Sequence, residues 1–191
     1  RKRQVIQNLP NNEIIVSGKR FLNFSSNDYL GITADSSLNK FFQEGIDRYG
    51  SSAVSSSLIT GYHDSHKALE ETICAWTNQE RALLFSSGFS ANLGFLNTFN
   101  SSKSTFLLDK LSHASLIDGV KEGKGKFKRF KHNSVEQLNT FLQSNSNKTT
   151  IVVTESVFSM DGDIAPLAEV HSNAVDNNAF LYVDDAHGIG V

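Results

Sequence analysis

An acidic pair and a histidine follow an apolar run near the end of the sequence. Asp184 and Asp185 come directly after the run 179–183, and His187 comes three residues after Asp184. An apolar run of this length between turn residues is typical of a buried strand in a parallel sheet. Ligands of open α/β sheets bind outside the carboxyl ends of the strands. Asp184 and His187 are therefore candidates for chemistry, although an acidic pair after a strand can equally be a solvated turn.

Three further junctions of this kind come earlier in the chain. The turn 86–89 contains Gly88 and precedes a predicted helix, whose unpaired N–H groups and partial positive charge would suit a phosphate. His113 and Ser159 each follow a predicted strand. Taken singly, these are an ordinary glycine turn, a structural histidine and a loop serine. Because all would lie on one edge of one sheet, together they predict a binding crevice.

Two sequence patterns resemble metal-binding sites, but one has the wrong spacing and the other lacks ligands. The segment 154–163 is rich in carboxylates and hydroxyls, but its spacing is not that of an EF-hand. His63 and His66 would make half of a zinc site, and no third ligand is evident nearby. We therefore predict no metal ligands.

A hydrolase is the second chemical alternative. Gly88-Phe-Ser90-Ala-Asn92 is close to the nucleophile elbow of the α/β-hydrolases, and the order Ser90, Asp184, His187 is that of a catalytic triad. Asn92 replaces the second glycine, however, and an aspartate three residues before the histidine is poorly placed to orient it. These departures disfavour a hydrolase.

The elements that would position these residues alternate regularly. Predicted strands at 81–85, 105–108, 127–130, 149–154 and 179–183 are separated by predicted helices that begin near His66 and at 91, 114, 135 and Pro166. Alternation of strand and helix favours an α/β fold, with a mostly parallel sheet flanked by helices.

The first part of the chain reads differently. Residues 14–24 predict two short strands around a Ser17-Gly18 turn, and residues 38–49 predict a helix. We therefore expect a small N-terminal segment over 1–48 and the first part of a large α/β domain over 49–191. Because the chain stops just after a predicted central strand, we expect it to be part of a longer one.

Composition excludes several classes of protein. The 191 residues carry a net charge of −2, which gives no general argument for binding nucleic acid or an anionic membrane. Cys74 is the only cysteine, so no internal disulfide can form, and a cytoplasmic location fits. No apolar run approaches the roughly 20 residues of a membrane helix. The basic stretch 121–131 could bind nucleic acid, but a solvated edge strand is the favoured interpretation.

Several motifs resemble those of the α-oxoamine synthase family of fold-type I pyridoxal-phosphate (PLP) enzymes. They are FLNFSSNDYLG (21–31), HKALEE (66–71), RALLFSSGFSAN (81–92), LSHASLIDG (111–119), VTESVFSMDGDIAPLAE (153–169) and VDDAHGIGV (183–191). The resemblance extends over essentially the whole chain. It implies a PLP-dependent transferase fold with PLP as cofactor.

The resemblance also implies roles for the residues after the strands. Asp184 would pair with the pyridine nitrogen of PLP and keep it protonated, which deepens the electron sink. His187 would hydrogen-bond the phenolic oxygen of the cofactor. His113 would stack on the ring and touch the substrate. These three residues would be the catalytic set.

Five further positions match cofactor- or substrate-binding residues of the family. Ser159 would bind near the cofactor oxygen, and Gly88 with Phe89 would shape the pocket near the phosphate. Asn27 would reach an active site across a homodimer and bind the amino-acid carboxylate. Arg1 falls where the family has a substrate-binding arginine.

The branch of the family nearest in motif condenses L-alanine with pimeloyl-CoA or pimeloyl-acyl carrier protein in biotin biosynthesis. The alternatives are a glycine C-acetyltransferase and a non-catalytic support subunit without the Schiff-base lysine. In the family this lysine follows the Asp-x-x-His motif, so we expect it beyond Val191 and expect this chain alone to be inactive. The family's glycine-rich stretch is replaced in this chain by Gly-Ser-Ser-Ala-Val-Ser at 50–55.

Overall fold

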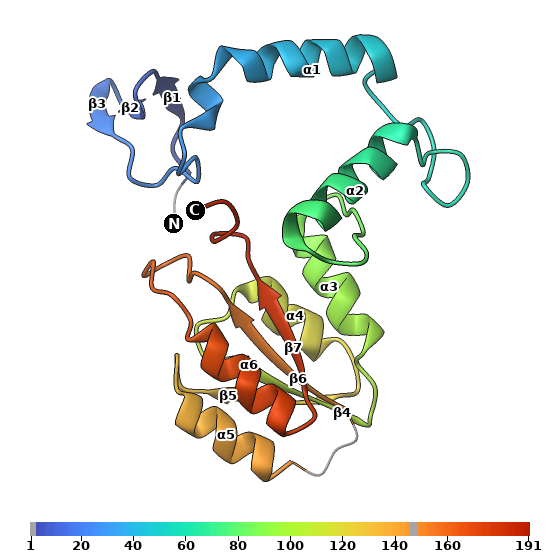
Figure 1. Cartoon of the computed structure of the whole chain (residues 1–191). Helices are drawn as coiled ribbons and strands as arrows, with labels where there is room; N and C mark the ends of the chain where they lie inside the picture. The colour runs from blue at the N-terminus through green and yellow to red at the C-terminus, as the bar shows by residue number, and fades with distance from the viewer. Residues whose placement is uncertain (1–2, 146–148) are drawn as a thin grey trace. The chain divides into compact units, whose positions relative to one another are not determined.

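A computed structural model describes residues 3–145 and 149–191 of the chain. The chain divides into two compact units, one running up to Leu83 together with Val191 and the other running from Leu84 to Gly190. Each unit is described by itself (Figure 1). The expected boundary at residue 48 remains a prediction.

The first unit contains a small antiparallel sheet followed by helices. Its elements are β1 (Ile6–Leu9), β2 (Glu13–Val16), β3 (Lys19–Leu22), the short 3-10 helix η1 (Ile32–Ala34), α1 (Ser36–Tyr49) and α2 (Asp64–Thr77). The strand order is β1-β2-β3. Ser17 and Gly18 have φ of 51° and 78°, as a two-residue hairpin turn with the twist of its strands requires. The predicted hairpin is confirmed, and β1 adds a strand that the sequence did not predict.

Side chains define where both long helices begin. The Asp35 carboxylate accepts the N–H of Ser37 at 2.8 Å and so caps α1. At α2 the N-cap is His63, and His66 Nδ1 accepts the N–H of His63 at 3.1 Å. His66 therefore closes the first turn of a helix, which accounts for the two histidines without a metal.

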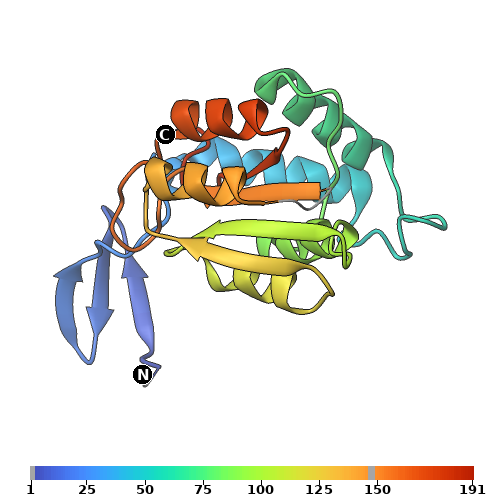
Figure 2. The ribbon, with the colours of Figure 1, turned by 90° about the horizontal axis from the view of Figure 1, so that it is seen from below.

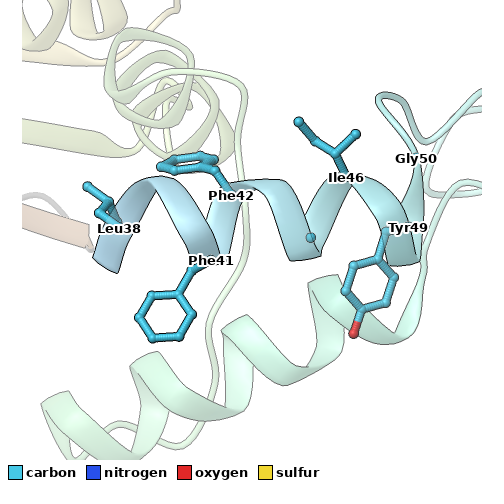
Figure 3. Close-up of a pocket in the computed structure, with 7 residues that line it drawn as sticks. Leu38, Phe41, Phe42, Ile46, Tyr49 and Gly50 are labelled. Carbon is cyan, nitrogen blue, oxygen red and sulfur yellow. The ribbon is translucent and has the colours of Figure 1, made fainter. Parts of the chain in front are cut away.

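Helix α1 presents an apolar surface to solvent. Figure 3 shows a shallow pocket along this one helix, lined by Leu38, Phe41, Phe42, Gly45, Ile46, Tyr49 and Gly50. Phe41 and Phe42 are 65% and 66% exposed, and none of the residues of α1, all of which are described, is buried. In the described part of the chain, no helix is long and apolar enough to cross a membrane.

The second unit is a parallel sheet with helices on both faces, which confirms the predicted α/β class. Its elements are α3 (Gly88–Thr98), β4 (Ser104–Asp109), α4 (Ala114–Lys121), β5 (Lys126–Phe130), α5 (Val135–Gln143), β6 (Thr149–Glu155), α6 (Leu167–Asp176) and β7 (Phe180–Asp184). The strands lie in the order β5-β4-β6-β7, and every neighbouring pair is parallel. Figure 2 shows α4 on one side of this sheet and α5 and α6 on the other.

The core follows from the alternation of side chains along two central strands. One face contributes Phe106, Leu108, Ile151 and Val153, which pack against Leu96 of α3 and Leu116 and Val120 of α4. The other contributes Leu107 and Val152, which pack against Leu138 and Leu142 of α5 and Val170 and Ala174 of α6. Because both faces are covered, β4 and β6 are continuous apolar runs.

The direction of the chain across the sheet reverses between β4 and β6. From β4 the chain passes through α4 to β5 on one side, then returns through α5 to β6 on the other side of β4. The crevice outside the carboxyl ends at such a reversal is the usual binding place in this class of fold. The predicted site residues are therefore to be sought after β4 and β6.

One predicted strand is absent. Residues 81–85, all described, form no hydrogen-bonded ladder in the structure. A strand needs a neighbour for its N–H and C=O groups, and no described segment pairs with this one. The basic stretch does form the edge strand β5, in which Lys126 and Lys128 are exposed, as expected for a solvated edge.

Candidate functional site

Polar side chains gather at the carboxyl ends of β4, β6 and β7 in the second unit. His113 follows β4, Glu155 ends β6, and Asp184 ends β7 with His187 three residues later. Asp184, His113 and His187 all lie close enough to the buried carboxyl of Glu155 to act on it electrostatically. The structure thus brings the three predicted catalytic residues to one edge of one sheet, around a glutamate that the sequence did not indicate.

Asp184 is held in place through both carboxylate oxygens. Oδ2 accepts a hydrogen bond from Asn92 Nδ2 at 2.8 Å, and Oδ1 accepts one from the N–H of Ala186 at 3.1 Å. The Asp184 carbonyl also accepts the N–H of Ser156 at 3.0 Å, which ties the end of β7 to the end of β6. A carboxylate has about four acceptor sites, so Asp184 retains capacity for a ligand.

Asn92 is a residue of the candidate site that the sequence did not indicate. It is buried in α3, and its amide also donates to Ser115 Oγ at 2.9 Å and accepts from the Tyr182 hydroxyl at 2.6 Å. Burial and the charge of Asp184 raise the pKa of Tyr182 to about 12, so its hydroxyl stays a donor at neutral pH. The amide of Asn92 is thereby fixed with its nitrogen toward Asp184.

The same network reaches His113, the N-cap of α4. Ser115 Oγ lies 2.8 Å from His113 Nδ1, and the N–H of Ser115 also points at Nδ1, at 3.3 Å. Because Ser115 Oγ already accepts from Asn92, its proton is free to bond Nδ1. His113 therefore carries the proton of its neutral form on Nε2. A polar chain runs from Asp184 through Asn92 and Ser115 to an exposed imidazole.

Glu155 anchors the backbone of this loop. Its Oε1 accepts the N–H of His113 at 2.6 Å, across the point where the sheet reverses direction. Burial raises the pKa of Glu155, and the charge of Asp184 raises it further, against the opposing effect of the His113 hydrogen bond. The carboxyl therefore keeps its proton to a higher pH than an ordinary glutamate.

The glycine after His187 lies close to two polar side chains. A Cβ at Gly188 would overlap the carboxylate of Asp185 and the hydroxyl of Ser156, which are hydrogen-bonded to each other. This bond joins the loop after β7 to the loop after β6. A larger residue at position 188 would have to displace these two side chains and so disturb the bond between the loops.

The turn before α3 precedes a helix, as predicted, but it does not follow a strand of the sheet, because residues 81–85 form none. The Ser87 hydroxyl accepts the N–H of Ser90 at 3.1 Å, so it caps the helix and leaves the first-turn amides of Gly88 and Phe89 directed outward. A Cβ built at Gly88 would meet nothing within 4 Å. The hydroxyl of Ser90 lies 3.0 Å from that of Ser87, and Asp184 bonds Asn92 instead, so the hydrolase triad is not assembled.

The remaining predicted positions are more scattered. Ser159 is exposed on the loop between β6 and α6. Asn27 is exposed in the first unit, where its Oδ1 lies 3.5 Å from the Tyr29 hydroxyl. Arg1 lies outside the described residues. Among residues 3–145 and 149–191, no group of three or more His, Cys, Asp or Glu side chains could hold a metal ion.

Comparisons with known proteins agree with this geometry. The model of the family "Aminotransferase class I and II" matches residues 19–191. The 8-amino-7-oxononanoate synthase of Aliivibrio fischeri (strain ATCC 700601 / ES114) is 47% identical over 93% of this chain and 46% of its own length. That of Vibrio cholerae serotype O1 is 46% identical over 100% of this chain and 49% of its own length.

A solved serine palmitoyltransferase variant from S. paucimobilis, with a bound PLP–myriocin aldimine, has a TM-score of 0.88 at 32% identity. The match covers 95% of this chain and 46% of the palmitoyltransferase chain. This chain thus spans about half the length of the curated relatives it matches. The fold is that of the fold-type I PLP-dependent transferases, as the motifs predicted. The chain belongs to the aminotransferase class I and II family.

Proposed function

We propose that the complete protein is a PLP-dependent C-acyltransferase that condenses L-alanine with a pimeloyl thioester to give 8-amino-7-oxononanoate, a step of biotin biosynthesis. The observation that carries the proposal is the polar chain that fixes Asp184 and orients the exposed imidazole of His113. The names of the relatives at 46% and 47% identity supply the choice of substrates. Either CoA or an acyl carrier protein would deliver the pimeloyl group.

The residues present fit PLP. A protonated pyridine nitrogen needs a fixed carboxylate, which Asp184 provides. A phosphate needs N–H donors, which the first turn of α3 offers at Gly88 and Phe89, beside an open position at Gly88. A flat aromatic ring needs an accessible stacking partner, and the imidazole of His113 is exposed. PLP, when bound, supplies an electron sink for the pair of electrons left on the substrate Cα.

Asp184 would keep the pyridine nitrogen protonated, because a nearby carboxylate raises the pKa of that nitrogen. Asn92 would serve this role by holding Asp184 Oδ2 at 2.8 Å. His187, at the other end of the same turn, would donate a hydrogen bond to the phenolic oxygen of the ring. Ser159 would bind the cofactor near that oxygen.

His113 would contact both cofactor and substrate. Its Nδ1 is turned toward Ser115, so Nε2 is the atom that carries or gives up a proton toward a ligand. The bond from its own N–H to Glu155 fixes the backbone from which the ring projects. His113 would thus hold the ring face and the amino-acid carboxylate in a defined orientation.

Substrate recognition draws on residues outside the second unit. Asn27 and Arg1 would bind the carboxylates of the substrates, with Asn27 acting across the interface of a homodimer. The Schiff-base lysine would lie in the part of the relatives' length that this chain does not span. A complete protein with twice the monomer mass in analytical ultracentrifugation would support this arrangement, and a monomer would contradict it.

The proposal is tested by absorbance spectroscopy of the protein expressed from its complete reading frame. With PLP present, we expect a visible band from lysine-bound cofactor that shifts on adding L-alanine. Pimeloyl thioester should then yield 8-amino-7-oxononanoate, detected by mass spectrometry. A shift with glycine and turnover with acetyl-CoA alone would indicate a glycine C-acetyltransferase. No band at all would indicate a support subunit without the lysine.

A further inference from the structure

A third histidine at the same edge of the sheet contacts two carboxylates. His132 lies two residues after β5, and its Nδ1 is 3.0 Å from Asp109 Oδ1 at the end of β4. Its Nε2 is 2.6 Å from Asp163 Oδ2, in the loop between β6 and α6. The ring of Phe158 stands edge-on to the imidazole, with 4.4 Å between ring centroids. One side chain therefore joins segments that follow three different strands.

The two carboxylates are otherwise held by neutral donors. Asp109 is fully buried, and its oxygens also accept the N–H groups of Leu111 and Asn133, at 2.8 and 2.9 Å. Asp163 Oδ2 also accepts Asn133 Nδ2 at 2.8 Å, and its Oδ1 is buried without a hydrogen-bond partner in the described structure. Two carboxylates in a partly buried place thus face one imidazole.

This geometry requires a proton on each ring nitrogen. A neutral imidazole has one N–H and could satisfy only one of the two carboxylates, whereas an imidazolium donates to both. Burial alone lowers the pKa of His132, but the hydrogen bonds and charges of Asp109 and Asp163 outweigh it, and the net shift is upward. Asp109, from β4, and Asp163, from the loop after β6, are the titratable groups that act on the ring.

Both carboxylates lie four residues from a residue of the candidate site. Asp109 begins the turn that leads to His113, and Ser159 precedes Asp163 within one compact loop. That loop is closed by a bridge between Val157 and Ile164 and by the bond from the Phe158 N–H to the Asp163 carbonyl, at 3.0 Å. A displacement of Asp163 would therefore move the loop as a body.

We propose that His132 is a positioning residue, a cationic clasp that holds the loops bearing His113 and Ser159 against the end of β5. The assignment of those two residues rests on the proposed function, but the clasp itself does not. It fixes the distance between the loop after β4 and the loop after β6. Deprotonation of His132 removes the imidazole N–H from one of the two carboxylates and loosens the loop that carries it.

The test compares His132→Gln with His171→Gln in the protein expressed from its complete reading frame. His171 is an exposed histidine on α6 and serves as the matched control. Amide hydrogen exchange is measured at several pH values on the segments 110–113 and 156–165, with Leu107 and Val152 of the core strands as internal references. His132→Gln should raise exchange in both segments at least about tenfold and leave the reference amides unchanged. His171→Gln should change neither.

The pH dependence separates a charged clasp from simple packing. In the wild-type protein, protection of both segments should fall as the pH rises through the titration of His132, followed by the NMR signal of its Cε1–H. The midpoint should lie above about 6.5, the ordinary value for histidine. In His132→Gln, protection should be low at every pH. Asp163→Asn provides a second variant, in which the His132 midpoint should fall.

Three results would overturn the proposal, two of them from hydrogen exchange. One is unchanged loop protection in both variants, and the other is a uniform loss of protection that includes Leu107 and Val152. A His132 that stays neutral down to pH 6 would also contradict it. None of these measurements needs substrate or turnover, so a failed activity assay would leave the clasp standing and would count only against the proposed function.

Discussion

Strand β4 and helix α1 both carry many apolar side chains, yet their surroundings differ completely. Every residue of β4 is buried, since helices cover both faces of the strand and β5 and β6 flank it. Every residue of α1 is at least partly exposed, although its apolar side chains lie at helical spacing (Figure 3). The apolar pattern identifies the element in each case. The pattern does not indicate which other elements cover the apolar side chains.

This contrast separates two kinds of contribution to stability. Side chains of β4 lose their contact with water on folding, at roughly 25 cal/mol per Å² of apolar surface. Side chains of α1 that remain in water contribute little. The three predicted catalytic residues belong to the second unit, in which Asn92 and Glu155 are buried polar groups with fixed partners.

Replacement of a side chain on the covered strand should have the largest effect. Leu107 is completely buried between β4 and the helices α5 and α6. Leu107→Ala should lower the free energy of unfolding by about 3 kcal/mol, through lost burial and the cavity left behind. Urea denaturation measures the change, with Leu58→Ala, at 91% exposure, as the matched substitution. Equal decreases in the free energy of unfolding of the two variants would contradict the expected difference between covered and exposed side chains.

The second-largest effect is expected for the side-chain amide of Asn92, in the second unit. Asn92→Ala leaves Asp184 with its backbone bond to Ala186 but without its side-chain donor. We expect the dissociation constant of PLP to rise about 10- to 100-fold, as for loss of a hydrogen bond to a charged group. Absorbance titration with PLP measures it. Asn97→Ala, on the exposed side of the same helix, is the control, and similar affinities in both variants would contradict the role of Asn92.

Glu155 makes the stability of the second unit depend on pH. Because its pKa is raised in the folded state, its contribution is full below about pH 4.3, the unfolded value, and is lost as the pH rises through the folded value. Glu155→Gln keeps an oxygen for the His113 N–H but cannot ionise. Its melting temperature relative to wild type should therefore increase from about pH 4.5 to pH 7.

The matched control is the exposed Glu169 on α6. Glu169→Gln should show no such trend in the difference between variant and wild-type melting temperatures. A difference for Glu155→Gln that decreases with pH would mean that the folded state stabilises the ionised carboxylate of Glu155, which is the opposite of a raised pKa.

The smallest effect is expected on α1. Phe42 is 66% exposed, so Phe42→Ser should change the free energy of unfolding by less than about 0.5 kcal/mol, as for most surface substitutions. Urea denaturation under the conditions used for Leu107→Ala gives the comparison. A loss of several kcal/mol would show that something outside the described residues covers this helix.

Much of the fold could be predicted because local patterns and tertiary structure agree. The β-branched and apolar run 149–154 indicated β6, and the parallel sheet followed from the alternation of strands and helices. Residues 81–85 show the limit. Their composition favours a strand, but strand formation depends on a partner that no local pattern supplies, and none is present in the described chain.

The site residues that come directly after a strand could be predicted from the sequence. Asp184, His187 and His113 stand at strand ends, and position along the sheet was enough to group them. Asn92 was considered only as a defect in a nucleophile elbow. A signal was available, since Asn92 lies four residues before Leu96 on one face of the helix 88–98, and a buried amide needs a hydrogen-bond partner. Which partner it has depends on β7, some 90 residues later in the chain.

The order of the strands also determines when β4 can pair with its neighbours during synthesis of the chain. Ser104 of β4 pairs with Thr149 of β6, and the difference between these numbers is 45 residues. At about 5 to 20 residues per second, a ribosome needs roughly 2 to 9 s to make that length. During this interval β4 can pair with β5 alone, and its other edge waits unpaired. The pairing at the centre of the sheet is thus completed only after this interval, and α6, which packs on Leu107 of β4, is made later still.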